Sequence, residues 1–467
     1  MKPMFIVSCP IDTYSGYGAR ARDFVKALIE LDEYDVKVLP QRWGETPWGF
    51  IDAHPEWKFL NPHLLPAGNQ LPKQPEIWCQ ITVPNEFQPV GKFNIGLTAG
   101  IETTGCHPTW VEGCNKMDLI LGSSTHSIEV LKNIKFEQRN QQTNEVVGQY
   151  GLQKPIEILT EGADLNIYQP KKSEFDLEAI EEEFAFLFVG HWMQGDLGED
   201  RKNVGLLVRL FFEAFKNKKK TPALILKTTS IGTSCMDRNE ILRRIDAIRN
   251  TVDATTLPNI YLLQGEFSNT EVNELYNHKK VKSMVNLTKG EGFGRPLLEF
   301  SLTKKPIIST NWSGHTDFLS EDFTSLLPGK LTKVHPSAVV KDIIMPEFEW
   351  FSVDNNAVIF ALRDMFTNYK KYKEKGIRQA HKSKTNFSFA KMVEQLKNHL
   401  DKYVPEIPME VPLQLPKLDL PNGFERAPEY KIQAKNKKKK QFYLGKKMTH
   451  PKKLWVGPQL VSRTYTL

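Results

Sequence analysis

The sequence is poor in cysteine. Its 467 residues include only five, an odd number without any CxxC pair. They are Cys9, Cys79, Cys106, Cys114 and Cys235. This pattern favours neither a disulfide framework nor a zinc ribbon. Cys106, His107 and Cys114 could be considered as metal ligands, but no fourth ligand follows at a usual spacing, so we expect no metal there.

Long hydrophobic runs are also missing. No stretch approaches the roughly 18 to 20 apolar residues that a membrane-spanning helix needs. The opening residues, MKPMFIVSCPIDTYSGYG, contain an apolar patch that is too short for a secretory signal and is typical of a first buried strand. We therefore expect a cytoplasmic protein without a transmembrane segment.

Basic residues are not in excess over most of the chain. The net charge is +7, but residues 431–467 hold eleven Lys or Arg and no Asp or Glu, which leaves about −4 for residues 1–430. The tail also carries four consecutive lysines, 437–440, among aromatic side chains. Such a segment could contact nucleic acid or another polyanion. It could equally be a strap packed on the first domain, or a solubilising tail, and the sequence leaves these alternatives open.

Short apolar runs recur along the chain and predict an α/β fold. Runs such as FIVSC, IWCQIT, FAFLFVG and PALILKT are typical of strands buried on both faces of a parallel sheet. They alternate with amphipathic helix candidates, which predicts doubly wound architecture, twice over. A charged stretch without a strand pattern, 167–183, separates the two halves. We predict domains at 1–168 and 169–400, followed by a Pro-rich, then Lys-rich, extension at 401–467.

The most informative segment is TKGEGFGRPLLEFSLTKKPIISTNWSGHTDFL, residues 288–319. It reads as a loop after a strand, with Pro296 at the first helical position and Glu299 in the first turn. Gly292 and Gly294 would let the backbone approach a ligand, and free amides at the helix start favour an anion. Two acids around such an anion site, Glu291 and Glu299, suit a ligand with phosphates in its middle and hydroxyls at both ends. A nucleotide sugar has that form.

This segment resembles the signature of the retaining glycosyltransferases of family 4, which have the GT-B fold. In their E-x7-E motif the two acids stand as Glu291 and Glu299 do here. The resemblance implies that Glu291 contacts hydroxyls of the donor sugar and Glu299 the ribose hydroxyls. It also implies that the loop amides near Phe293 and Gly294 face the diphosphate, with Arg295 beside them. Weaker similarity extends over most of residues 5–400.

A second resemblance concerns the segment FLFVGHWMQGDLGEDRKNVGLLVRLFFEAF, where Arg201 and Lys202 match the cations that neutralise the leaving diphosphate in this family. Bond cleavage leaves a nucleoside diphosphate with developing negative charge, and the sequence has no DxD pair to hold a metal. Side-chain cations must then stabilise that charge. A solvated loop with its own ion pairs is the alternative for this segment.

The first domain supplies further candidates. Gly16 and Gly18 lie between the first strand and helix, where the resemblance implies the donor phosphates, although their spacing is not the dinucleotide fingerprint. Glu102, Thr103 and His107 are candidates on the acceptor side. The histidine that the family often places near the acceptor has no clean match.

The sequence thus predicts a metal-independent retaining glycosyltransferase, a hexosyl- or pentosyltransferase that uses a nucleotide-sugar donor and no cofactor. The acceptor would be a hydroxyl of a glycan, a lipid-linked precursor or a modified nucleic-acid base. For the family, retention is attributed to front-face attack with the leaving phosphate as base. The alternative is a nucleic-acid or polyanion-binding protein on a catalytically degenerate body. An epimerase or phosphorylase of the same fold is a weaker third possibility.

Overall fold

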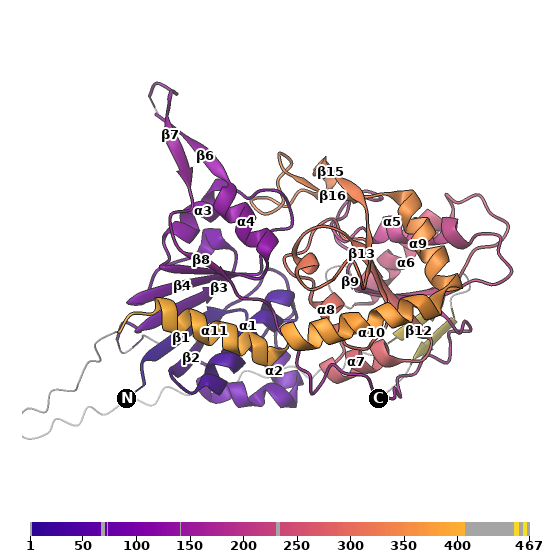
Figure 1. Cartoon of the computed structure of the whole chain (residues 1–467), viewed down its shortest axis with the longest axis horizontal. Helices are drawn as coiled ribbons and strands as arrows, with labels where there is room; N and C mark the ends of the chain where they lie inside the picture. Colours follow the sequence, from indigo (N-terminus) through magenta and orange to yellow (C-terminus); the bar gives the residue numbers. More distant parts are fainter. Residues whose placement is uncertain are drawn as a thin grey trace, which may run out of the picture.

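The computed structural model describes residues 2–66, 71, 73–140, 142–229 and 234–406, together with the backbone of 453–456 and 461–464. Two α/β domains lie side by side (Figure 1). Each is built on a parallel sheet with helices around it. The prediction of two doubly wound domains is therefore confirmed. Among the described helices, none combines the length and the apolar character needed to cross a bilayer.

The first domain contains a six-stranded parallel sheet in the order β2-β1-β3-β4-β5-β8. Its strands are β1 Met4–Cys9, β2 Asp35–Pro40, β3 Ile77–Ile81, β4 Phe93–Thr98, β5 Leu119–Gly122 and β8 Ile156–Ile158. The central strands are buried along their whole length, as continuous apolar runs predict. The helices are α1 Gly16–Leu31, α2 Phe50–Ala53, α3 Pro108–Asn115 and α4 Thr125–Asn133.

The second domain repeats this plan with the strand order β14-β13-β12-β9-β10-β11. Its strands are β9 Ala185–His191, β10 Ala223–Thr229, β11 Ile260–Gln264, β12 Val281–Asn286, β13 Ile307–Thr310 and β14 Ser325–Leu327. Its helices are α5 Val204–Phe215, α6 Cys235–Arg249, α7 Asn269–Asn277, α8 Arg295–Ser301 and α9 Asn355–Thr367, and a small antiparallel pair adds β15 Gly329–Lys333 and β16 Glu349–Val353.

Two helices connect the domains at the end of the described body. In Figure 1, α10 (Tyr369–Asn386) and α11 (Phe389–Tyr403) run end to end from the second domain to the first. Apolar residues of α11, including Met392 and Leu396, complete the core that β1 and α1 form. This last part of the predicted range 169–400 thus packs on the first domain, because its apolar stripe is buried there.

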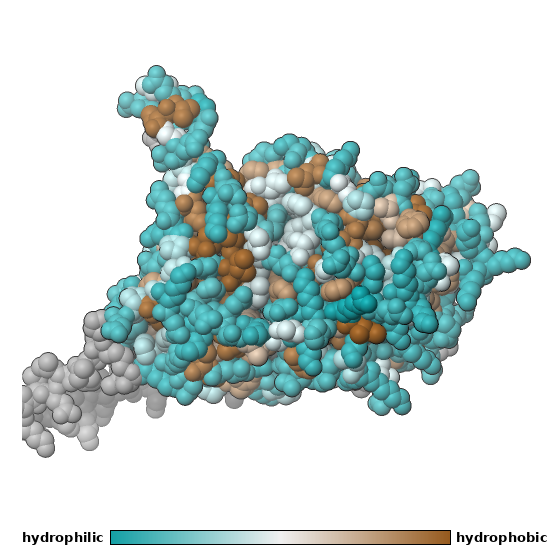
Figure 2. Space-filling view, viewed as in Figure 1, coloured by the Kyte–Doolittle hydropathy of each residue, from teal (hydrophilic) through white to brown (hydrophobic). Residues whose placement is uncertain are grey.

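Two features extend beyond the domains. A hairpin of β6 (Lys135–Arg139) and β7 (Val146–Gly151) projects from the first domain. Its Val146 and Val147 are exposed, and hydrophobic residues are visible on the hairpin in Figure 2. In the tail, β17 (Lys453–Val456) pairs antiparallel with β11 and with β18 (Val461–Thr464). The described part of the tail therefore extends the second-domain sheet, while the lysine run 437–440 lies outside the described residues.

Candidate active site

Glu291 lies in the loop between β12 and α8, next to the first domain. Its backbone N–H donates to Ser313 Oγ at 2.9 Å, and its carbonyl accepts from the Gly314 N–H at 2.9 Å. Gly294 caps α8 with a φ of +97°, a conformation that favours glycine. The helix begins at Arg295, one residue earlier than predicted. Glu299 is therefore the fifth helical residue rather than part of the first turn.

Two cations converge on Glu291 from the loop between β9 and α5. The Lys202 ammonium donates to the Glu291 carboxylate. Arg201 Nη1 lies 3.6 Å from Glu291 Oε2 and 3.5 Å from Glu102 Oε1, and it donates to the Gly290 carbonyl at 3.0 Å. Glu102 belongs to the first domain. Four side chains predicted from three separate segments therefore meet at the domain interface.

Burial makes these charges interact strongly. Burial alone would raise the pKa of Glu291, but Lys202 and Arg201 outweigh it and lower that pKa to about 2. Burial lowers the pKa of Lys202, and the Glu291 carboxylate opposes this shift. The Glu291 carboxylate is thus ionised at neutral pH, and moving either cation away would leave it with less compensation for its burial.

Glycines allow the two domains to touch beside this cluster. A Cβ on Gly292 would stand 2.1 Å from the Ala99 carbonyl oxygen, and one on Gly290 would stand 2.0 Å from the Glu102 carbonyl oxygen. Any side chain at these positions would force the backbones apart. Gly292, which was predicted to approach a ligand, therefore approaches the other domain, whereas the neighbours of Gly294 lie in its own domain.

Glu299 belongs to a second ionic cluster between the domains. Arg295 Nε donates to Glu299 Oε1 at 2.8 Å, while Arg295 Nη1 lies 2.5 Å from Asp23 Oδ2 on α1 and 3.4 Å from Glu161 Oε2. All three acids are largely buried. Burial raises the pKa of Glu299 to about 7, although Arg295 acts against the shift. One arginine shared by three buried acids does not fully compensate each of them.

The remaining predicted residues have mostly local roles. Gly18 packs against Thr13, whose carbonyl oxygen would lie 2.4 Å from an added Cβ, while Gly16 at the start of α1 has open space around it. Thr103 is buried, and its hydroxyl donates to the Gly105 carbonyl at 2.7 Å. His107 caps α3, and its Nε2 lies 3.8 Å from Asp342 of the second domain.

Phe293 has its side chain in the second-domain core, 5.1 Å from the ring of Phe318. Only its backbone amide could therefore serve the predicted anion site. The contacts of Phe293, Thr103 and His107 explain these residues without a ligand, and their predicted binding roles stay predictions.

Comparison with known proteins shows similarity of fold but none of sequence family. No family model and no curated protein matches this chain. Sucrose-phosphate synthase from Thermosynechococcus elongatus is similar in structure, with a TM-score of 0.56, 12% identity and coverage of 86% of this chain and 99% of its own. HepE from Anabaena, in complex with UDP and glucose, has a TM-score of 0.55 and 10% identity, and the match covers 86% of this chain and 100% of HepE. Trehalose-6-phosphate synthase has a TM-score of 0.53 and 11% identity, and the match covers 85% of this chain and 99% of that protein.

The fold is GT-B. The sequence prediction of this fold is confirmed. In GT-B proteins the carboxyl ends of two parallel sheets face each other, and ligands of open α/β sheets bind outside those ends. Here Glu102 follows β4, Arg201 and Lys202 follow β9, and Glu291 follows β12. The cluster thus lies beyond the carboxyl ends of parallel strands of both domains.

The sequence did not reveal His126, at the start of α4. Its ring lies 4.6 Å from that of Trp312 in the second domain, and its Nε2 is buried without a hydrogen-bond partner. Burial lowers the pKa of His126 to about 4, so the imidazole is neutral. Only its place in the STHS segment after a buried strand could have drawn attention to it. The sequence analysis did not single out Asp23 or Glu161, because these residues meet Arg295 only in the folded protein.

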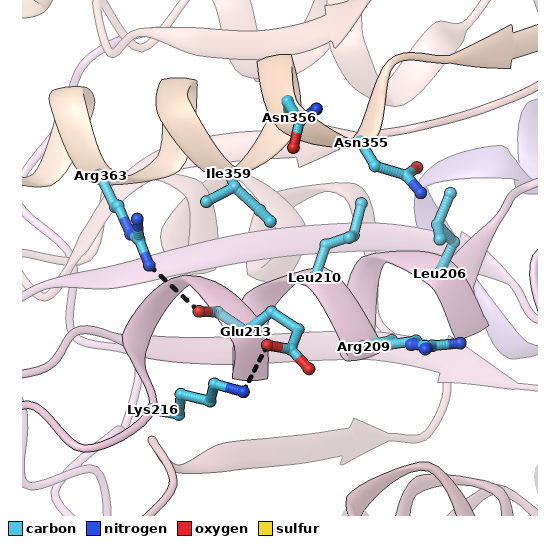
Figure 3. A pocket seen from close by; sticks show the side chains of 9 residues that line it. All are labelled: Leu206, Arg209, Leu210, Glu213, Lys216, Asn355, Asn356, Ile359 and Arg363. Carbon is cyan, nitrogen blue, oxygen red and sulfur yellow. Dashed lines mark hydrogen bonds and ion pairs between the residues drawn. The ribbon is translucent and has the colours of Figure 1, made fainter. Parts of the chain in front are cut away.

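Other possible sites do not coincide with the cluster. Within the described ranges, no group of three or more His, Cys, Asp or Glu side chains could hold a metal ion. A groove of about 580 Å³ lies between α5 and α9, lined by residues such as Leu210 and Ile359 (Figure 3). Part of its polar rim is engaged, since Arg363 donates to the Glu213 carbonyl and Lys216 pairs with Glu213 at 2.8 Å. None of the predicted site residues lines this groove.

Proposed function

We propose that this protein is a retaining glycosyltransferase that transfers a sugar from a nucleotide-sugar donor to a hydroxyl acceptor. The observation that carries the proposal is the largely buried cluster of Arg201, Lys202, Glu291 and Glu102 between the two GT-B domains. Charges removed from water are costly unless they are paired, and strongly perturbed ionisable groups cluster at functional sites.

The proposed chemistry follows from the charges of the cluster. When the bond between the anomeric carbon and the β-phosphate oxygen breaks, negative charge grows on the diphosphate. Arg201 and Lys202 would stabilise this charge without moving, because Glu291 and Glu102 already hold them in place. Glu291, ionised at neutral pH, would accept hydrogen bonds from donor-sugar hydroxyls. We further propose that the reaction needs no metal.

The similar structures support the choice of donor. The HepE structures contain UDP, UDP with glucose, or UDP-glucose, and the trehalose-6-phosphate synthase structure comes from work on glycosyl transfer with retention. A UDP-sugar is therefore the first donor to test. The proposal includes a hexose or pentose as the transferred sugar and membership of glycosyltransferase family 4.

The test is a thermal-shift screen with uridine, guanosine, adenosine, thymidine and cytidine diphosphates, followed by donor hydrolysis with the matching nucleotide sugar. One diphosphate at about 100 times its Kd should stabilise the protein by about 2.7 kcal/mol and raise its Tm by several degrees. Chelator should not change the hydrolysis rate. If none of the five diphosphates shifts the Tm, the proposal is wrong.

A further inference from the structure

The loop after β2, residues 41–49, carries two tryptophans that the proposed chemistry does not use. Trp48 is 45% exposed, whereas Trp110 and Trp350 in the core are 2% and 0% exposed. Trp43 in the same loop is half-buried. Isolated exposed aromatic residues are common, but two tryptophans on one loop at the carboxyl edge of a parallel sheet are more unusual.

This loop is held firmly against the segment between β1 and α1. The Gln41 N–H donates to the Cys9 carbonyl at 2.8 Å, the Tyr14 N–H to the Pro47 carbonyl at 3.1 Å, and the Gly49 N–H to the Asp12 carbonyl at 3.0 Å. Backbone bonds along both sides of the loop fix its path. The tryptophans are therefore presented on a defined surface.

A short chain of contacts joins this surface to the candidate active site. Trp43 stacks on Tyr17, with ring centroids 4.0 Å apart and planes at 22°. The Tyr17 hydroxyl lies 3.0 Å from Thr98 Oγ1 and accepts from the Ala99 N–H at 3.2 Å. The Ala99 carbonyl in turn contacts Gly292, the neighbour of Glu291. Trp43 thus lies on the first-domain side of the reaction centre.

Trp48 is the more accessible of the two tryptophans. Trp43 keeps part of its ring exposed, while the rest stacks on Tyr17 and packs against the first-domain core. By contrast, Phe50 is engaged by His54 at 3.9 Å and by the Arg22 guanidinium at 3.4 Å. Among the side-chain hydrogen bonds of the described residues, none comes from the indole N–H of Trp43 or Trp48, so each indole offers apolar surface and a hydrogen-bond donor to a ligand.

We propose that Trp43 and Trp48 bind the acceptor by stacking against the face of a neutral sugar ring, which makes the acceptor a saccharide. This inference depends on the proposed function. A sugar ring presents C–H groups on its face and hydroxyls at its edge, and these match the indole face and its N–H. The charges around the loop argue against nucleic acid, because residues 41–58 contain two basic and three acidic side chains. Binding along a nucleic-acid backbone needs a positively charged groove.

The test uses the full chain and the nucleotide sugar that the wild type hydrolyses. Product formation is measured with maltose, cellobiose, lactose and sucrose as acceptors, and with a single-stranded oligonucleotide. The variants are Trp48→Ala, Trp48→Phe and the control Phe59→Ala, which removes another exposed ring, 42% exposed, outside the loop. We expect Trp48→Ala to raise the acceptor KM at least tenfold, while Tm and donor hydrolysis in water stay unchanged. Trp48→Phe should recover part of the affinity, and Phe59→Ala should behave as wild type.

Three results would overturn the inference. They are an unchanged acceptor KM in Trp48→Ala, donor hydrolysis that no disaccharide diverts to transfer, and transfer to the oligonucleotide alone. Each of these leaves the proposed function intact, because the donor is still turned over. A wild type that hydrolyses no nucleotide sugar would instead remove the proposed function, and the saccharide assignment with it.

Discussion

Replacing Lys202 by Met tests the central feature of the site. The substitution keeps the length of the side chain and removes only its charge. In the structure the Lys202 ammonium pairs with Glu291 and is 12% exposed. Its loss would leave Arg201, 3.6 Å from Glu291, as the remaining cation beside that carboxylate. Both the leaving-group stabilisation and the balance of buried charge should therefore change.

The pKa of Glu291 gives the size of the electrostatic effect. Burial raises this pKa and the two cations lower it by more, so that it falls from its ordinary 4.5 to about 2. At about 1.36 kcal/mol per unit, this net shift amounts to about 3 kcal/mol. Because the depressed pKa stabilises the fold above pH 4.5 and this contribution is lost as the pH falls toward 2, Lys202→Met should unfold at a higher pH in acid. For catalysis, removing one pre-organised charge partner should reduce kcat by about 10² to 10³.

The assay is nucleoside diphosphate release under donor saturation, with Tm and acid unfolding followed in parallel. Lys202→Arg should retain part of the activity because it keeps the charge. Lys216→Met is a matched control, since Lys216 also forms a Lys–Glu pair, at 2.8 Å to Glu213, but on the surface of α5. If Lys202→Met folds and turns over donor at the wild-type rate, Lys202 does not stabilise the leaving group and the assignment of the site is wrong.

Three further predictions concern the interface between the domains. Arg295→Met should lower the Tm and weaken nucleotide binding, because it removes the cation that pairs with three buried acids; equal Tm values in calorimetry would contradict this. Glu299→Gln should remove a pH dependence. Burial raises the pKa of Glu299 to about 7, so the wild type should lose up to about 3 kcal/mol of folding stability relative to the variant as the pH rises from 4.5 through 7. Parallel Tm-against-pH curves for the two proteins would refute this prediction. Gly292→Ala should separate the domains, because its Cβ would stand 2.1 Å from the Ala99 carbonyl oxygen, whereas Gly148→Ala on the projecting hairpin should not. Small-angle scattering measures the difference, and identical radii of gyration would count against the contact.

Several parts of the fold follow from local sequence. Strands such as β3 and β10 are continuous apolar runs, and such runs can only be buried on both faces. Their alternation with amphipathic helices requires parallel sheets, so two doubly wound domains could be predicted before any contact was known. The EGFGRPLLE segment likewise indicated a loop that enters a helix, and the start of α8 differs from the expected position by one residue.

The site was predictable in part. Glu291, Arg201 and Lys202 follow buried strands in glycine-containing loops, and the resemblance to family 4 supplied their expected roles. Thr103 and His107 showed the limit of this reasoning, since a loop hydroxyl or imidazole can equally bond to the backbone two residues further on. The contact of His126 could not be predicted, because the ring it packs against belongs to Trp312, which is 186 positions away in the chain.

The sequence by itself determined the two α/β domains, the apolar strands and the kinds of charge available, because these depend on neighbours along the chain. Only the tertiary structure decided which charges meet. Arg295 pairs with Asp23 although 272 positions separate them, and α11 completes the core of the first domain. Contacts through Tyr17 and Ala99 connect Trp43 to Gly292, the neighbour of Glu291. Partners of this kind are fixed by how two finished domains pack together, and residue spacing carries no information about that packing.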